Sequence, residues 1–409
     1  MSPIIILDGL GLNNETLDNF LTVKIADIPL FERLMIILES EGFKNIYLLT
    51  DKKVKISNKN IKKPIGIKYI NSSELKNLNQ DLLCFQSNVV MNKKQLSNLI
   101  NHLKNINTCT NFKFNNKFSG VSFIHNSELK DIETNNVENS KFKDFKSLNL
   151  TDSPICLDES EIDTNNGRDF LFNHISKNVS GWVSKNINSK ISIPVSKILI
   201  KFNIHPNTIT FFVGCLGISC GYFYATNNPF IGAIILQLST ILDRCDGEVA
   251  RIKLKESKFG QWFDTALDQL SYFSMFIGIA ICLNNPNYFS LSNINIIIKQ
   301  FSIINVLLYI IFITTVLFFM IRRTSNGSLA YYPGEVDKRV PIKERSFFYR
   351  VISKYRFMLK REFFSPAMIF GSLLGYKVLA IVTLILFIFG LYHQVSDYLA
   401  LKERTDITY

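Results

Sequence analysis

Four aspartates stand in two closely spaced pairs, Asp243 with Asp246 and Asp264 with Asp268. Side chains three or four positions apart lie on the same face of an α-helix, so each pair points in one direction. Both pairs lie at the facing ends of two apolar, helix-length segments. A carboxylate at membrane depth is costly and is tolerated mainly where a cation or a polar cavity compensates it. The spacing therefore predicts two carboxylate pairs that converge on a divalent metal, and hence an enzyme.

Helix capping is the alternative role for these aspartates. It would explain Asp243 or Asp264 singly, because an aspartate at a helix start accepts hydrogen bonds from free backbone amides. It does not explain why all four carboxylates share a face, and this favours the metal site.

The aspartates belong to a longer pattern that spans positions 243–268. Besides the four aspartates it contains Gly247, Ala250, Arg251 and Gly260. This pattern resembles the signature of the CDP-alcohol phosphotransferases, with every specified position filled. The resemblance implies that an acceptor hydroxyl attacks the diphosphate of a CDP-alcohol donor, giving a phosphodiester and CMP. It also implies a homodimer.

The aspartates have separate expected roles in such a reaction. We expect Asp243, Asp246 and Asp264 to be metal ligands, and a metal there would offset the repulsion between an anionic diphosphate and its nucleophile. Because these ligands offer only oxygen, the expected metal is Mg²⁺, with Mn²⁺ as a substitute. Asp268 lies one helical turn beyond Asp264, which makes it the candidate catalytic base and a candidate ligand of a second metal.

Small residues and one arginine are expected to surround the CDP group, together with Asp243. The resemblance implies that Gly247, Ala250 and Gly260 leave room for the cytosine and ribose, whereas the alternative is that they only let helices approach closely. It assigns Arg251 to the diphosphate. A charge that only fixes the membrane topology would look the same.

The segment Pro206–Thr210 resembles the Pro-Asn-x-x-Thr opening of the first span in the same family. Proline is well tolerated at the start of a helix. We therefore expect Asn207 and Thr210 to face the nucleotide, and an N-cap role is the alternative for Asn207.

Basic side chains at cytoplasmic helix ends are the candidates for binding an acceptor phosphate. Arginine suits this role because its guanidinium makes bidentate contacts with phosphate. Juxtamembrane charge without a ligand is the alternative for each of the candidates, which are Arg322, Arg323, Lys360 and Arg361.

Six apolar segments near the length that crosses a hydrocarbon core, about 20 residues, occupy the C-terminal half. Loops before the first segment and after the second and fourth are rich in Lys and Arg, which places both termini and the aspartates on the cytoplasmic side. The sequence thus predicts an all-α, multi-pass domain over residues 206–409, embedded in the lipid bilayer. The six segments are 206–226, 229–251, 259–284, 300–321, 362–376 and 377–400.

The net charge of +12 does not indicate a nucleic-acid partner. The basic residues cluster beside the apolar segments, where they fix topology and meet anionic headgroups. The seven cysteines show no metal-ligand spacing, and His174, His205 and His393 form no metal constellation.

Residues 166–205 are expected to link this domain to the N-terminal half. Between Phe170 and Phe202, apolar residues recur at helical spacing with lysines between them. Such a segment can lie in the headgroup plane. A connecting helix packed on the soluble domain is the alternative.

Residues 1–165 alternate strands with helices, which predicts a layered α/β domain. Strands are expected at 3–7, 45–50, 82–85 and 121–124, and a helix at 29–41.

This N-terminal half resembles the sugar nucleotidyltransferases in three motifs. These are the Gly-rich stretch 7–11, the group formed by Lys24, 28–30 and 32–33, and the late stretch 162–164. Two departures imply a degenerate, inactive cytidylyltransferase-like domain: positions 12–16 carry no Arg or Lys, and Asn88 replaces a metal-binding Asp. An amide oxygen can ligate Mg²⁺ but brings no negative charge. A lone Gly-x-Gly is a weak signal, so an unrelated α/β domain is the alternative.

Together the two halves resemble bifunctional enzymes in which an inositol-phosphate cytidylyltransferase is fused to a di-inositol-phosphate-phosphate synthase. That resemblance favours CDP-inositol as donor and an inositol phosphate as acceptor. A phospholipid synthase that uses CDP-diacylglycerol or CDP-archaeol is the alternative. A transporter or a non-catalytic scaffold is disfavoured, because the spans lack Gly/Pro-broken repeats and no aspartate is missing.

Overall fold

The computed structural model describes the chain in several stretches, and the account below concerns these alone. The chain divides into two compact units, one of residues 1–177 with Ile252–Leu254 and one of residues 178–251 and 255–409. Each unit is described by itself. The described residues are 4–8, 23–49, 66–70, 74, 78, 80–86, 89–114, 117–128, 146–149, 154–156, 164–177, 183–289, 293–323, 337, 340–355, 358 and 360–402.

The N-terminal unit is built on a seven-stranded mixed sheet with the order β10-β8-β9-β6-β1-β4-β5. The central strand β1 pairs in parallel with β4 and with β6, and β9 runs antiparallel to β6 and β8. The strands are β1 (Ile4–Asp8), β4 (Asn45–Leu49), β5 (Gly66–Ile70), β6 (Leu82–Gln86), β8 (Thr110–Phe114), β9 (Lys117–Ile124) and β10 (Lys146–Asn149). Two short ladders join β2 (Lys24–Ile25) to β3 (Ile28–Pro29) and β7 (Val89–Val90) to β11 (Ile155–Cys156).

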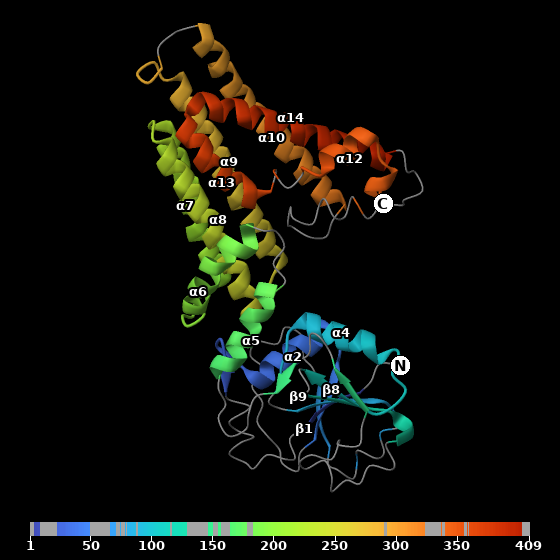
Figure 1. Ribbon diagram of the computed structural model, residues 1–409. Coiled ribbons are helices and arrows are strands. Elements are labelled where there is room, and N and C mark those ends of the chain that lie inside the picture. The colour runs from blue at the N-terminus through green and yellow to red at the C-terminus, as the bar shows by residue number, and fades with distance from the viewer. Residues whose placement is uncertain are drawn as a thin grey trace. The chain divides into compact units, whose positions relative to one another are not determined.

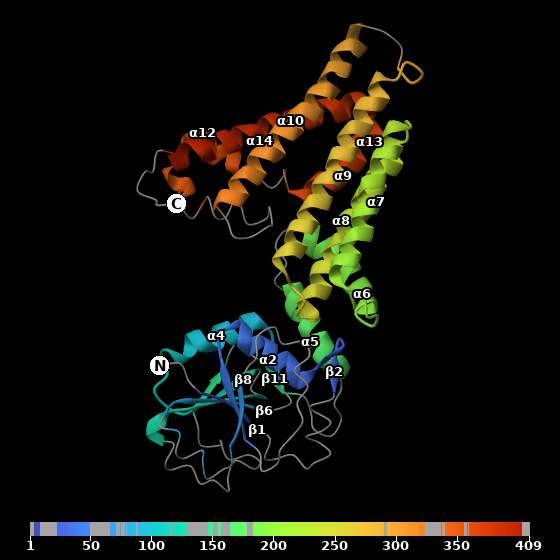
Figure 2. The same cartoon turned by 180° about the vertical axis from the view of Figure 1, so that it is seen from behind.

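Helices α2 (Leu30–Ser40) and α4 (Lys93–Leu103) cover one face of this sheet (Figures 1 and 2). Their apolar faces meet the sheet in one buried core, which includes Leu34, Met35, Leu38, Leu96, Leu99, Leu83, Phe85 and Phe112. A capping box between Asn92 and Gln95 starts α4. The unit closes with α5 (Thr164–Lys177).

The prediction of a layered α/β domain is confirmed, and each predicted strand overlaps an observed one. The predicted helix 29–41 is α2. The residues that carry the resemblance to nucleotidyltransferases are described only in part, because positions 9–16, 87–88 and 162–163 lie outside the described residues.

Six long helices of the second unit coincide with the six predicted apolar segments. They are α7 (Pro206–Ala225), α8 (Pro229–Ile252), α9 (Lys258–Asn284), α10 (Asn293–Arg323), α13 (Arg361–Leu374) and α14 (Tyr376–Lys402). By length and apolar composition, four of them can cross a membrane: α7, α9, α10 and α14. The apolar part of α13 is shorter, at Phe363–Leu374. Helix α8 carries charged residues over its second half.

Helices α7 and α9 pack closely along their length, beside α8 (Figures 1 and 2). A side chain at Gly221 or Gly278 would run into the facing helix, at Ser274 and at the Gly221 carbonyl respectively. Ser274 Oγ donates to the Ile218 carbonyl at 2.7 Å. Small residues thus let the two backbones approach, as is usual between membrane helices.

Hydrogen bonds join the last helix, α14, to its neighbours. Asn305 of α10 donates to the Ala380 carbonyl at 2.9 Å and to Thr383 at 2.8 Å. Near the other end of α14, buried Asp397 accepts from Arg345 and, at 2.7 Å, from Tyr349 of α12 (Phe347–Ser353). Apolar packing then fills the space between the helices, with Tyr224, Leu236, Met275, Phe276, Tyr309 and Leu379 among the buried residues.

A helical segment precedes α7 in the same unit. It consists of a π-helical turn (Ser184–Asn188) followed by α6 (Ser189–Leu199). The predicted linker is therefore helical on both sides of residues 178–182, which lie outside the described part.

Candidate active site on helices α8 and α9

Three aspartates converge where α8 faces α9. One carboxylate oxygen from each of Asp243, Asp246 and Asp264 lies within 4.8 Å of the others. All three sit inside their helices, and α9 is instead capped by Ser257, whose Oγ accepts from the Gly260 amide at 3.0 Å. The helix-cap alternative is therefore wrong.

The donor set suits a hard divalent cation. It consists only of carboxylate oxygens, which Mg²⁺ and Mn²⁺ prefer. Asp264 Oδ1 is buried and has no hydrogen-bond partner among the described residues. A buried carboxylate oxygen without a partner is costly, and a bound cation would compensate it. The residues present therefore fit the metal that the sequence predicts.

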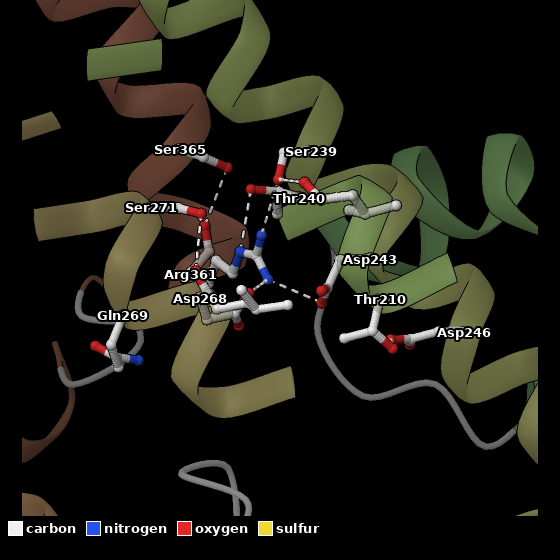
Figure 3. A network of polar contacts seen from close by, with 12 residues as sticks. Thr210, Ser239, Thr240, Asp243, Asp246, Asp268, Gln269, Ser271, Arg361 and Ser365 are labelled. Atoms are coloured by element: carbon white, nitrogen blue, oxygen red, sulfur yellow. Dashed lines mark hydrogen bonds and ion pairs between the residues drawn. The ribbon is translucent and has the colours of Figure 1, made fainter. Parts of the chain in front are cut away.

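Arg361, the first residue of α13, lies between Asp243 and Asp268 (Figure 3). Its Nη1 pairs with Asp243 Oδ2 at 2.8 Å and with Asp268 Oδ1. Its Nε donates to Thr240 Oγ1 at 3.2 Å. One guanidinium thus bridges the two helices that carry the carboxylates, and all three charged side chains are at least 79% buried, with exposed fractions of 16%, 21% and 20%.

Thr210 of α7 also reaches the cluster. Its hydroxyl contacts Asp246 Oδ2 and lies 3.1 Å from the Pro206 carbonyl (Figure 3). Asn207 is not the cap of α7, because His205 holds that position and its Nδ1 accepts from the Asn207 amide at 3.2 Å. The N-cap alternative for Asn207 is wrong, and His205, which the sequence left without a role, is the cap.

The small residues of the pattern lie at close approaches. A Cβ at Gly260 would stand 3.1 Å from Asn207 Oδ1, so the starts of α7 and α9 meet there. A Cβ at Gly247 would stand 3.3 Å from Nη1 of Arg251, which is exposed and lies one turn along α8. Gly247, Ala250 and Gly260 are all partly buried. Roles in CDP binding for these residues, and for Asn207, stay predictions.

The four basic candidates for the acceptor phosphate differ in placement. Arg361 joins the aspartates, whereas its neighbour Lys360 is exposed just before α13. Arg322 and Arg323 end α10, and their side chains lie outside the described residues.

Sequence reasoning missed Thr240, which stands one turn before Asp243 on the same face of α8 and contacts Arg361. The three-residue spacing that joined the aspartates would have found it.

The family comparison agrees with this geometry. Residues 203–401 match the family model for CDP-alcohol phosphatidyltransferase. The C-terminal half of the chain is a CDP-alcohol phosphatidyltransferase domain. All of the candidate site residues fall within the matched range.

Several curated proteins are similar to part of this transferase domain. A bifunctional IPC transferase and DIPP synthase of Aquifex aeolicus is 37% identical over 105 residues, which are 25% of this chain and 24% of that protein. One of Thermococcus kodakarensis is 40% identical over 89 residues, 22% of this chain and 20% of that protein. An archaetidylinositol phosphate synthase of Pyrococcus horikoshii is 34% identical over 98 residues, 23% of this chain and 52% of that protein. The chain thus spans about a quarter or less of the two bifunctional relatives and about half of the third.

Replacing Thr210 by valine tests whether the hydroxyl beside Asp246 supports metal binding. We expect Thr210→Val to weaken Mn²⁺ binding about tenfold, because groups that orient metal ligands typically contribute that much to affinity. Mn²⁺ titration followed by electron paramagnetic resonance measures this. Thr208→Val is the matched control, since Thr208 is exposed in the same turn. Equal affinities of the two variants would contradict the prediction.

Proposed function

We propose that the protein is a membrane transferase that moves the substituted phosphate of a CDP-alcohol to a hydroxyl of an acceptor alcohol and releases CMP. The observation that carries this proposal is the convergence of three aspartates, with Arg361, inside a domain of this transferase family. Asp243, Asp246 and Asp264 would hold Mg²⁺ or Mn²⁺. When bound, the cation would offset the charge of the donor diphosphate and of the departing CMP.

The proposed reaction exchanges one phosphorus–oxygen bond for another. The acceptor oxygen forms a bond to the phosphorus that carries the alcohol. The bond from that phosphorus to the bridging oxygen breaks, and CMP leaves with the electron pair. Asp268 accepts the hydroxyl proton, and its position one turn beyond Asp264 on α9 supports this role.

In this proposal Arg361 pairs first with carboxylates and then with the acceptor phosphate. Without substrate its guanidinium pairs with Asp243 and Asp268. With an anionic acceptor present, the same fork-shaped group is suited to bind the phosphate by two parallel hydrogen bonds. Movement of Arg361 toward the acceptor would release Asp268 to act as the base.

The favoured substrates are CDP-inositol as donor and an inositol phosphate as acceptor. Relatives named bifunctional IPC transferase and DIPP synthase support this choice. The second candidate is a phospholipid synthase that uses CDP-diacylglycerol or CDP-archaeol, which the relative named archaetidylinositol phosphate synthase supports. The partition of the labelled product between water and organic solvent separates the two.

The proposed topology has six spans, with both termini and the aspartates on the cytoplasmic side. All six helices coincide with apolar segments, and basic residues flank their expected cytoplasmic ends. We further propose a homodimer, which is a common assembly among soluble oligomers and is implied by the family resemblance. The proposed domains are 1–165, the linker 166–205 and 206–409.

For the N-terminal unit we propose a degenerate cytidylyltransferase-like domain without activity. In open α/β sheets, ligands bind at the carboxyl ends of strands where the strand order reverses. Here that place lies between β1 and β6, whose last residues Asp8 and Gln86 are paired in register. The Gly-rich stretch follows β1 and Asn88 follows β6. The missing basic residue at 12–16 and the amide at 88 both weaken binding of a metal-bound triphosphate.

Incubation with CTP and inositol 1-phosphate tests the N-terminal proposal. We expect no pyrophosphate release from the protein or from its Asn88→Asp variant, because the loop at 12–16 still lacks a basic side chain. CDP-inositol formation by the unmodified protein would contradict it.

Replacing Asp264 by asparagine tests the transferase proposal. We expect Asp264→Asn to abolish CMP release from CDP-inositol and from CDP-diacylglycerol, because the amide removes a charge from the metal ligands. Purified protein with Mg²⁺, labelled donors and several alcohol acceptors provides the assay. Asp169→Asn, which changes an exposed aspartate of α5, is the control. Absence of CMP release from the unmodified protein with every donor would favour a transporter or a scaffold instead.

Replacing Arg361 by lysine tests its contact with the acceptor phosphate. Lysine keeps the charge and loses the bidentate geometry, so we expect Arg361→Lys to raise KM for inositol phosphate about tenfold or more. KM for the donor should change less. Arg350→Lys is the control, because it makes the same exchange at an exposed arginine of α12. A raised donor KM with an unchanged acceptor KM would contradict this role.

A further inference from the structure

Glu248 lies in the middle of the aspartate pattern but on the other side of α8. It is two residues beyond Asp246, about 200° around the helix at 3.6 residues per turn. Its side chain is fully buried, with an exposed fraction of 0%. The proposed chemistry gives this carboxylate no role. A buried carboxylate persists only where hydrogen bonds or opposite charge compensate it, so its partners indicate what it does.

Two serines of α6 hold the carboxylate of Glu248. Ser192 Oγ donates to Oε1 and Ser196 Oγ donates to Oε2, each at 2.7 Å. The serines are four positions apart, so they lie on one face of α6, and both have an exposed fraction of 0%. Arg244, one turn earlier on α8, places its Nε 3.8 Å from Oε1. Both oxygens of Glu248 are therefore engaged by a second helix.

Neighbouring residues of α8 extend the same contact. The Arg244 guanidinium donates to Ser184 in the π-helical turn. The Cys245 thiol lies 3.6 Å from the Ser192 carbonyl. Residues 244, 245 and 248 thus face α6, whereas 243 and 246 face the metal site. The two sets alternate along one helical turn and a half.

The burial of α6 is reversed relative to an ordinary amphipathic helix. Its buried side chains are hydroxyls, whereas Ile187 in the preceding turn, Ile191 and Ile198 are 42%, 45% and 57% exposed. The side chains that α6 buries completely are therefore polar. The hydrogen bonds to Glu248 are fully buried contacts that fix the position of this helix on α8.

From these contacts we propose that Glu248 is a positioning residue of the transferase site. It binds α6 to the outer face of α8 and thereby fixes the rotation of α8 about its own axis. That rotation aims Asp243 and Asp246 at Asp264. The inference rests on the proposed function for the identity of the bound cation.

The test removes the two hydroxyls and leaves the carboxylates in place. Ser192→Ala/Ser196→Ala is made in the full-length protein, and Mn²⁺ affinity is measured by paramagnetic resonance without substrate. We expect about tenfold weaker Mn²⁺ binding, the range found for groups that orient metal ligands. Hydrogen exchange should become faster in α6. At saturating Mn²⁺, kcat should return toward that of the unmodified protein.

Ser189→Ala is the matched control. Ser189 is buried on the same helix, and among the described residues its hydroxyl bonds only to the Lys185 carbonyl, at 2.7 Å. We expect its Mn²⁺ affinity to equal that of the unmodified protein. If Ser192→Ala/Ser196→Ala also leaves Mn²⁺ affinity unchanged, the positioning role is wrong even where thermal stability falls.

Glu248→Gln completes a double-mutant cycle. The amide still accepts one serine hydrogen bond, so we expect a smaller loss of Mn²⁺ affinity than in the serine variant. In the serine variant's background the same change should add nothing, because the bonds are already gone. Additive losses would overturn the proposal. If the unmodified protein binds Mn²⁺ but releases no CMP, the proposed function is wrong. The positioning role is then still decided by the Mn²⁺ affinities of the serine and glutamate variants.

Discussion

The compensation of negative charge inside an apolar helix bundle is the constraint on which the second unit depends. Asp243, Asp246, Asp264 and Asp268 lie on helices that are otherwise rich in Ile, Leu and Phe. Each buried carboxylate needs a partner, because the free energy lost when the charge leaves water exceeds what a weak contact contributes. Arg361 of α13 is the partner of Asp243 and Asp268. Thr210 of α7 is the partner of Asp246, whereas Asp264 Oδ1 has none among the described residues. The site therefore determines which helices must meet, and apolar packing fills the rest.

The features that the sequence predicted well are those that depend on local periodicity. Apolar runs located all six helices within a few residues, except that α10 begins earlier than its predicted segment, at Asn293. Alternating strand and helix signals located the central sheet. The aspartate spacing correctly predicted that three carboxylates lie together. The polar faces of two otherwise apolar helices face each other because neither can face an apolar surrounding.

The features that the sequence did not reveal are contacts between distant segments. Arg361 lies 93 residues from Asp268, and the sequence offered it as a phosphate-binding residue or as juxtamembrane charge, without indicating its contact with the aspartates. The sequence around Glu248 does not indicate its partners, because Ser192 and Ser196 stand more than fifty residues earlier. No spacing rule within one helix reports such pairs. Only the packing of one helix on another brings them together.

Helix α8 has apolar contacts in its first half and polar contacts with distant segments in its second half. Its first half packs among apolar side chains, and its second half has carboxylates on one side and Glu248 with Arg244 on the other. Such a helix cannot face lipid along its charged half. Helices α7, α9 and α13 supply partners on the aspartate side, and α6 supplies them on the Glu248 side. The segment before the first span is thus part of the architecture of the transferase domain.

The chemistry of the site also limits which residues can select the substrate. The aspartates and Arg361 are suited to a diphosphate and to a phosphorylated acceptor, and these groups are common to a soluble and a lipid product. The alcohol of the donor differs between the two cases, so the residues that distinguish inositol from a lipid must lie beyond the aspartate cluster. A lipid tail has to reach the bilayer between helices, whereas inositol needs hydrogen-bonding groups around a closed polar space. The difference is therefore to be sought in side chains outside the metal ligands.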